Sequence, residues 1–287
     1  MNIQSLSIVV PTGYCWNHCP YCVSRTHCEN YGDFSKRLVD DIITPNYMNR
    51  IKFVRDQGCN TMMITGTAEP QQNLPFVHRL LYLNSHLPQP FYNVEFQTTG
   101  SGMTEGDIED LASLGVTTLA LSISSFDADR NAEIIHMPEN KKNSYYDLIE
   151  WAHEENMNVR ACLNLTDEFN RYFPEQYTKW ARGYGIEQLT FRKMYYSNMP
   201  FCDERTWTTN HHLDDTKFYQ IKAFIERAGK QVAILPYGFR QYDVQSVSVV
   251  IDDDCMSKDN IANFKYAILR PNGKLYSQWD LKGSLIF

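Results

Sequence analysis

Residues 6–22 read LSIVVPTGYCWNHCPYC, an apolar run that stops at a Pro-Thr-Gly turn and leads into three cysteines, Cys15, Cys19 and Cys22. The run predicts a buried strand over 6–10, and the turn places the cysteines just beyond its carboxyl end. Three thiolates in the pattern C-x3-C-x2-C can hold only part of a metal centre. A [4Fe–4S] cluster normally takes four cysteines, so three leave one iron with an open coordination position for a substrate or cofactor. The motif therefore favours a catalyst over a passive electron carrier.

The composition is that of an ordinary globular protein. The chain has 287 residues, enough for one α/β barrel, and 43% of them are hydrophobic. No apolar run approaches the roughly 18 residues that cross a bilayer, and the first residues lack the pattern of a signal peptide. Eight cysteines, three of them clustered, do not suggest a secreted disulfide scaffold, so the expected compartment is a reducing cytoplasm. The net charge of −7 and the lack of long basic runs weigh against a nucleic-acid partner.

Short β-rich runs alternate with longer helical stretches along the first two thirds of the chain. Strands are expected at 6–10, 62–64, 94–98, 117–123, 159–165 and 188–193. Helices are expected at about 36–57, 73–85, 104–114, 141–156 and 174–184. This alternation predicts βαβ units and an α/β fold, a partial (β/α)6 TIM-like barrel. Catalytic groups of such sheets gather at the carboxyl ends of the strands, which is where the cysteines fall.

The pattern changes after about residue 196. A loop rich in Asn, Pro and Asp is expected over 197–216, followed by a helix at about 214–229 and then by short strands. A hairpin is expected over 265–278, turning at Pro271-Asn272-Gly273. We therefore expect a barrel over 1–196 and a small C-terminal α+β cap over 197–287 that packs on it.

Taken alone, the cysteine motif leaves other interpretations open. Closely spaced thiolates also suit tetrahedral zinc, with His18, His27 or Cys28 as a fourth ligand. Unrelated reduced thiols are a further alternative. The competing class is thus a non-catalytic iron–sulfur or zinc protein.

The pattern C-x3-C-x-aromatic-C after the first strand of a βα series resembles the radical S-adenosylmethionine (radical SAM) superfamily. The resemblance implies that Cys15, Cys19 and Cys22 hold a [4Fe–4S] cluster whose open iron binds SAM. It also implies that an electron from the cluster cleaves SAM to a 5′-deoxyadenosyl radical, which abstracts hydrogen from a substrate. Tyr21 matches the aromatic position whose backbone lies near the adenine.

The stretch after the second expected strand, TGTAEP over 65–70, resembles the family's Gly-Gly-Glu-Pro turn. Thr67 and Ala68 replace the two glycines, whereas Glu69 and Pro70 are kept. The resemblance implies that this turn contacts the methionyl amine of SAM. The same residues also suit a strand end followed by a helix that begins at proline, and both interpretations hold together.

Four further strand ends resemble the family in the right order. The resemblance implies that Thr98 lies beside the SAM carboxylate and that Ser122 contacts the ribose, although Ser124 stands where an acid is usual. It likewise implies that Asn164 contacts SAM and that Arg192 lies near the SAM carboxylate. Each match is also an ordinary strand end, and only their joint order behind the cysteines distinguishes them.

The tail resembles part of the molybdenum-cofactor GTP cyclase group. Residues 269–276, LRPNGKLY, resemble the hairpin that follows the first cysteine of an auxiliary cluster there. A second cysteine normally follows that hairpin, but this chain has Ser277, Gln278 and Trp279. Only Cys202 and Cys255 lie beyond the sixth expected strand, so a single cluster is expected.

The predicted function is that of a radical SAM enzyme acting on a small-molecule or nucleotide-like substrate, with a reducing partner such as flavodoxin or ferredoxin. Modification of a peptide or protein is the runner-up, and activation of a glycyl-radical enzyme is disfavoured by the long tail. A solvated turn is expected at 252–254, and Cys28, Cys59 and Cys162 are expected to be small buried thiols. Candidate substrate contacts are Tyr14, Gln97, His136, Arg160, Tyr195, Tyr196 and residues 237–240.

Overall fold

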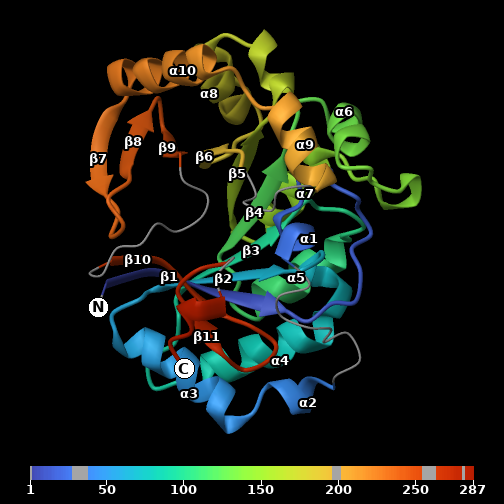
Figure 1. The fold of residues 1–287 in the computed structure, drawn as a ribbon, viewed down its shortest axis with the longest axis vertical. Helices are drawn as coiled ribbons and strands as arrows, with labels where there is room; N and C mark the ends of the chain where they lie inside the picture. The colour runs from blue at the N-terminus through green and yellow to red at the C-terminus, as the bar shows by residue number, and fades with distance from the viewer. Residues whose placement is uncertain (1, 28–37, 196–201, 254–262, 280–281) are drawn as a thin grey trace.

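The fold consists of one curled β-sheet with helices packed on its outer face (Figure 1). The computed structural model describes residues 2–27, 38–195, 202–253, 263–279 and 282–287. The sheet has eleven strands in the order β11-β10-β1-β2-β3-β4-β5-β6-β9-β8-β7. Its central strands are parallel, so the predicted α/β fold, a partial TIM-like barrel, is confirmed.

Each of the six predicted barrel strands is present. They are β1 (Asn2–Val10), β2 (Thr61–Gly66), β3 (Asn93–Thr98), β4 (Thr118–Ile123), β5 (Asn158–Leu165) and β6 (Gln188–Lys193). β1 begins four residues before the predicted run and is buried along most of its length. Helices cover the outer face and the barrel interior covers the inner one, so most residues of the strand are buried, including the polar Ser5 and Ser7.

The helices on the outer face follow the strands in sequence. They are α2 (Val39–Ile42), α3 (Pro45–Asp56), α4 (Leu74–Ser85), α5 (Glu105–Ser113), α6 (Ala128–Ile134), α7 (Tyr145–Glu154) and α8 (Pro174–Gly183). The short helix α1 (Val23–His27) lies instead at the end of the barrel where the strands have their carboxyl ends. The prediction of a single helix over 36–57 is wrong, because the helix is interrupted between α2 and α3. Pro45 lacks an N–H and disfavours a helical residue before it, so Thr44 instead caps α3 by accepting from the Tyr47 N–H.

The tail adds strands to both ends of the same sheet. Its elements are α9 (Asp203–Asn210), α10 (Asp215–Ala228), β7 (Lys230–Ile234), β8 (Arg240–Val244), β9 (Val247–Asp252), β10 (Asn263–Leu269) and β11 (Leu275–Tyr276). β9 pairs with β6 and β10 pairs with β1, both in parallel. The loop predicted over 197–216 is wrong where α9 forms, whereas the β10–β11 hairpin is confirmed. The division of the chain at residues 196 and 197 stays a prediction.

A buried ion pair joins the two sides of the barrel opening. Lys265 of β10 binds Asp252 of β9 at 2.6 Å, and their side chains are 3% and 7% exposed. The solvated turn predicted at 252–254 is therefore wrong for Asp252, whereas Asp253 is exposed and Asp254 lies outside the described residues. The main apolar core fills the space between the sheet and the outer helices. None of the described helices is long and apolar enough to span a membrane.

Candidate active site

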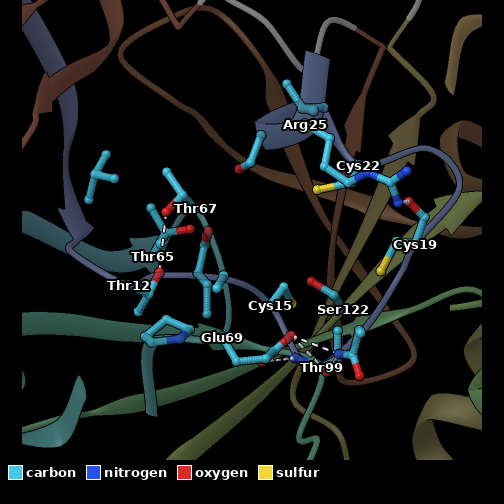
Figure 2. Close-up of a pocket in the computed structure, with 18 of the residues that line it drawn as sticks. Thr12, Cys15, Cys19, Cys22, Arg25, Thr65, Thr67, Glu69, Thr99 and Ser122 are labelled. Carbon is cyan, nitrogen blue, oxygen red and sulfur yellow. Dashed lines mark hydrogen bonds between the residues drawn. The ribbon is translucent and has the colours of Figure 1, made fainter. Parts of the chain in front are cut away.

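A cavity of about 900 Å³ opens at the carboxyl ends of the barrel strands. It lies at the end of the barrel where parallel α/β folds place their functional loops. Figure 2 shows part of its lining: Cys19 and Cys22 lie across from Thr65 and Thr67, whereas Cys15 lies beside Glu69. All eleven residues predicted to bind metal or cofactor line it: Cys15, Cys19, Cys22, Tyr21, Thr67, Ala68, Glu69, Thr98, Ser122, Asn164 and Arg192.

The three cysteines lie on the loop of residues 11–22, here called the cluster loop, between β1 and α1. All three are free thiols and partly buried. Burial, together with the smaller effect of the nearby Glu69 carboxylate, raises the pKa of the Cys15 thiol to about 11. Burial also raises the pKa of the Cys19 and Cys22 thiols. Thiolates become favourable in such surroundings when a bound metal cation balances their charge.

This arrangement of thiols fits an iron–sulfur cluster. Within the described residues, no three His, Cys, Asp or Glu side chains converge closely enough to share one metal ion. A cubane has several irons, and each can take a different thiolate. The Asn17 side-chain oxygen, between Cys15 and Cys19 in sequence, is buried without a hydrogen-bond partner and belongs to a residue lining the same cavity. Of the further zinc ligands considered, His18 is exposed and Cys28 lies outside the described residues.

Glu69 is the centre of a buried hydrogen-bond network. Its side chain is almost inaccessible, at 6% exposure. One carboxylate oxygen accepts from Asn17 Nδ2 at 3.1 Å and from Thr99 Oγ1 at 2.9 Å. The other accepts from Thr98 Oγ1 at 2.6 Å, from the Thr99 N–H at 3.0 Å and from Gln71 Nε2 at 3.2 Å. The carboxylate thus ties the cluster loop to the end of β3 (Figure 2).

The turn after β2 holds the cluster loop through two further side chains. Gln72 Nε2 donates to the Tyr14 carbonyl at 2.7 Å, and Gln72 Oε1 accepts from the Trp16 N–H at 3.2 Å. Asn73 Nδ2 donates to the Pro11 carbonyl at 2.7 Å. The amide of Gln72 therefore binds the backbone on both sides of Cys15. The position of Gln72 two residues after Pro70 could have indicated this role, but polar residues are common in such turns.

The Tyr21 side chain points into the barrel. Its hydroxyl lies within hydrogen-bond distance of Ser124 Oγ and 3.4 Å from Asn164 Nδ2. Burial raises the pKa of the Tyr21 phenol. Its ring packs against Trp207 of α9, with centroids 5.5 Å apart. Ser124, which stands where the family usually has an acid, therefore bonds a side chain of the protein itself.

The loop after β2 is tight. A Cβ added to Gly66 would lie 2.5 Å from the Ala68 carbonyl oxygen, so any larger residue would displace the backbone. Thr67 Oγ1 lies 3.2 Å from Thr12 Oγ1 on the cluster loop. Small residues at this turn therefore keep its backbone close to the cavity.

The helix α9 covers the cluster loop from the tail. Glu204 pairs with Arg25 at 2.8 Å, next to the contact between Trp207 and Tyr21. The sequence predicts a loop where α9 forms, because its eight residues, DERTWTTN, have poor helix propensity overall. Packing against the cluster loop supplies what local propensity does not.

The structure divides the candidate substrate contacts into two groups. Tyr14, Gln97 and Tyr195 line the cavity, whereas His136, Arg160 and residues 237–240 do not. Arg160 instead bonds Glu95 at 2.6 Å, and Tyr196 lies outside the described residues. The sequence analysis did not predict several other residues that line the cavity, among them Ser7, Val9, Met63, Tyr266 and Arg270.

Burial in the structure tests the prediction for two of the remaining cysteines. Cys59 and Cys162 are 1% and 3% exposed, so their prediction as small buried thiols is confirmed. Cys202 caps α9, where its sulfur accepts from the Arg205 N–H at 3.4 Å. Cys255 lies outside the described residues, as does Cys28.

Several solved structures share this fold. anSMEcpe with bound AdoMet has a TM-score of 0.64 and 14% identity, over 99% of this chain and 77% of its own. Streptococcus suis SuiB bound to the precursor peptide SuiA has a TM-score of 0.60 and 13% identity, over 96% of this chain and 59% of its own. Coproporphyrinogen III oxidase (HemN) from Escherichia coli has a TM-score of 0.52 and 12% identity, over 80% of this chain and 54% of its own. At these identities the likeness shows the fold alone.

The chain spans 59% of the length of SuiB. No curated protein matches the sequence. A family model does match it, that of the radical SAM superfamily, over residues 9–168. The match covers more than half of the 287 residues, from the end of β1 to the turn after β5, and it includes the whole cluster loop. The chain therefore belongs to the radical SAM superfamily of enzymes, which use a [4Fe–4S] cluster and S-adenosylmethionine.

Proposed function

We propose that the chain cleaves S-adenosylmethionine reductively at a single cluster held by Cys15, Cys19 and Cys22, and acts on a small-molecule or nucleotide-like substrate. One observation carries the proposal: one cavity collects the three cysteines and every residue predicted to bind the cofactor. When bound, the cluster supplies the electron that converts SAM into a 5′-deoxyadenosyl radical able to abstract hydrogen. The protein's part is to hold the reactants in place and to exclude water.

The residues of the cavity divide this work. The cysteines bind iron, and the Glu69 network holds their loop against β3. Ser122, Asn164 and Arg192, on the ends of three successive strands, face the same space and would bind the polar groups of SAM. α9 and the tail close the site on the side of Tyr21. We expect electrons from a small donor such as flavodoxin or ferredoxin.

Action on a peptide is the second candidate. The fold is shared with SuiB in a complex with its precursor peptide, and with anSMEcpe in a complex with a peptide. The sequence identities to both proteins are too low to infer a shared substrate, so these structures support this candidate only through the shared fold. A product search with short peptides and with nucleosides separates the two candidates.

Anaerobic reconstitution tests the proposal. About four iron and four sulfide should bind per chain, and a reductant should then convert SAM into 5′-deoxyadenosine. Cys19→Ala should abolish cluster assembly, whereas Cys59→Ala, which removes a buried thiol outside the cavity, should leave it intact. One zinc per chain without sulfide, or full SAM cleavage by Cys19→Ala, would show that the proposal is wrong.

A further inference from the structure

One wall of the cavity is apolar and aromatic, and no predicted cofactor residue lies on it. Val9 of β1, Met63 of β2 and Tyr266 of β10 belong to a small apolar cluster that is separate from the main core, and Trp279 packs on it. All four residues line the cavity. We call these four residues the aromatic wall. The strands that carry it, β10, β1 and β2, lie side by side at one side of the barrel (Figure 1).

The two rings of the aromatic wall are held in a defined arrangement. Tyr266 and Trp279 meet edge to face, with centroids 6.1 Å apart and planes at 71°. The guanidinium of Arg270 lies 5.6 Å from the Trp279 ring centroid, and its Nη2 donates to the Trp279 carbonyl at 2.7 Å. The indole is therefore oriented before any ligand arrives. A preorganised surface of this kind loses less entropy when it binds a ligand.

A polar atom lies at the edge of the aromatic wall. The Ser7 hydroxyl is fully buried and has no hydrogen-bond partner, although Ser7 lines the cavity. Ser7 and Val9 are two residues apart on β1, so their side chains face the same side of the sheet. A buried hydroxyl without a partner is costly, and a ligand that reaches it can remove that cost.

The cavity is large for a ligand pocket. Its volume of about 900 Å³ lies near the top of the range of about 300–1,000 Å³ for pockets that bury one drug-sized ligand. The predicted cofactor residues occupy the cluster loop and the ends of β2 to β6. The space along β1 and β10 is left for the substrate.

We propose that the aromatic wall binds a planar aromatic or heteroaromatic ring of the substrate, with a polar atom on the ring edge directed to Ser7. This inference rests on the proposed function, since it places the ring beside SAM. Two rings at 71° form a corner, and a third ring gains both stacking and edge-to-face contacts there. An aliphatic group of equal area gains only the apolar contact.

Matched small probes test this inference on the holoenzyme reconstituted with cluster and SAM. The aromatic probe is 4-methylphenol, and the saturated control with the same substituents and a similar size is 4-methylcyclohexanol. Dissociation constants come from titrations followed by saturation-transfer NMR. We expect tighter binding of 4-methylphenol, and about a threefold to tenfold loss of that affinity in Trp279→Leu, with a much smaller change for the control probe.

Two variants serve as controls. Trp279→Phe keeps a ring and should retain most of the preference for 4-methylphenol. Tyr92→Leu removes an aromatic side chain that is 69% exposed and outside the cavity, and should change neither affinity. If Trp279→Leu does not fold, as judged by circular dichroism, Tyr266→Leu makes the same comparison.

The inference is overturned if the two probes bind equally well to the wild type, or if folded Trp279→Leu keeps the full preference. SAM cleavage by the wild-type protein is measured separately. Cleavage without a preference for the aromatic probe overturns this inference and leaves the proposed function standing. A preference without cleavage supports the aromatic wall and removes the proposed function.

Discussion

Replacing Glu69 with alanine removes a carboxylate that lines the cavity and accepts five hydrogen bonds. Not all of the donors then lose every partner. Gln71 Nε2 keeps the Ser101 carbonyl at 2.9 Å, and Asn17 Nδ2 keeps Thr99 Oγ1 at 2.9 Å. Among the described residues, the Thr99 N–H has no other acceptor, so this part-buried donor is left unsatisfied.

The expected loss of stability follows from this count. Hydrogen bonds to a charged group contribute about 1.5–3 kcal/mol each, and an unsatisfied buried donor costs about 1–3 kcal/mol. The variant avoids the desolvation of the buried carboxylate, which offsets most of that gross sum, so the unsatisfied Thr99 donor sets the remaining loss. We therefore expect Glu69→Ala to lower the free energy of unfolding by about 3 kcal/mol.

Glu69→Gln should cost less, about 1–2 kcal/mol, because its amide oxygen can still accept from the Thr99 N–H. Its NH2 group would face Asn17 Nδ2, and that conflict is relieved if the Asn17 amide turns its unpartnered oxygen inward. A double-mutant cycle of Glu69→Gln with Asn17→Ala should then give a coupling energy, since the two residues share one bond.

Urea unfolding under anaerobic reducing conditions, followed by circular dichroism, measures these losses. Glu154→Gln, which changes an exposed carboxylate on α7, is the matched control and should stay within about 0.5 kcal/mol of the wild type. The same small change in Glu69→Ala would refute the assignment of Glu69 as the residue that anchors the cluster loop.

Three further predictions follow from the packing. Lys265→Met takes from Asp252 its buried ammonium partner and should cost about 3–5 kcal/mol in urea unfolding, most of it recovered when Asp252 is also made apolar. Burial raises the pKa of Cys59 to about 11, so its folded thiol stays protonated between about pH 9 and 11 while the unfolded one ionises. The free energy of unfolding of the wild type should therefore fall between about pH 9 and 11, and it should fall less in Cys59→Ala. Iodoacetamide at pH 8.5 should label the partly exposed Cys202 before the buried Cys59. Trp207→Ala should cost about 1 kcal/mol and speed the removal of iron by a chelator, because its ring packs on the cluster loop.

Much of the fold could be predicted because the barrel strands are locally encoded. Each of the six is an apolar or alternating run that ends at a turn, and a parallel strand buried on both faces needs little else. The helix boundaries were close where a cap or a proline marks them, as at Thr104 of α5. α9 was missed because the low helix propensity of its Thr and Asn residues outweighs the acidic first turn that marks its start.

The candidate site shows the same division. The resemblance of the cysteine motif and of the strand ends to the radical SAM family pointed to eleven residues; all of them line one cavity, and their binding roles stay predictions. The interactions of Glu69 could not be predicted, because Asn17, Gln71 and Thr99 are unremarkable polar residues until the chain folds. The pairing of β10 with β1 and of β9 with β6 is likewise non-local and leaves no mark on the local pattern.

The sequence by itself determined the βα alternation, the cluster motif after the first strand and the order of the polar strand ends, since each depends on residues close together in the chain. The tertiary structure alone decided that the tail completes both ends of the sheet, that five donors surround Glu69, and that Tyr266 and Trp279 face the cavity. The physical reason is that these contacts join residues far apart in sequence. They form only when burial of the core makes up for the entropy of closing long loops.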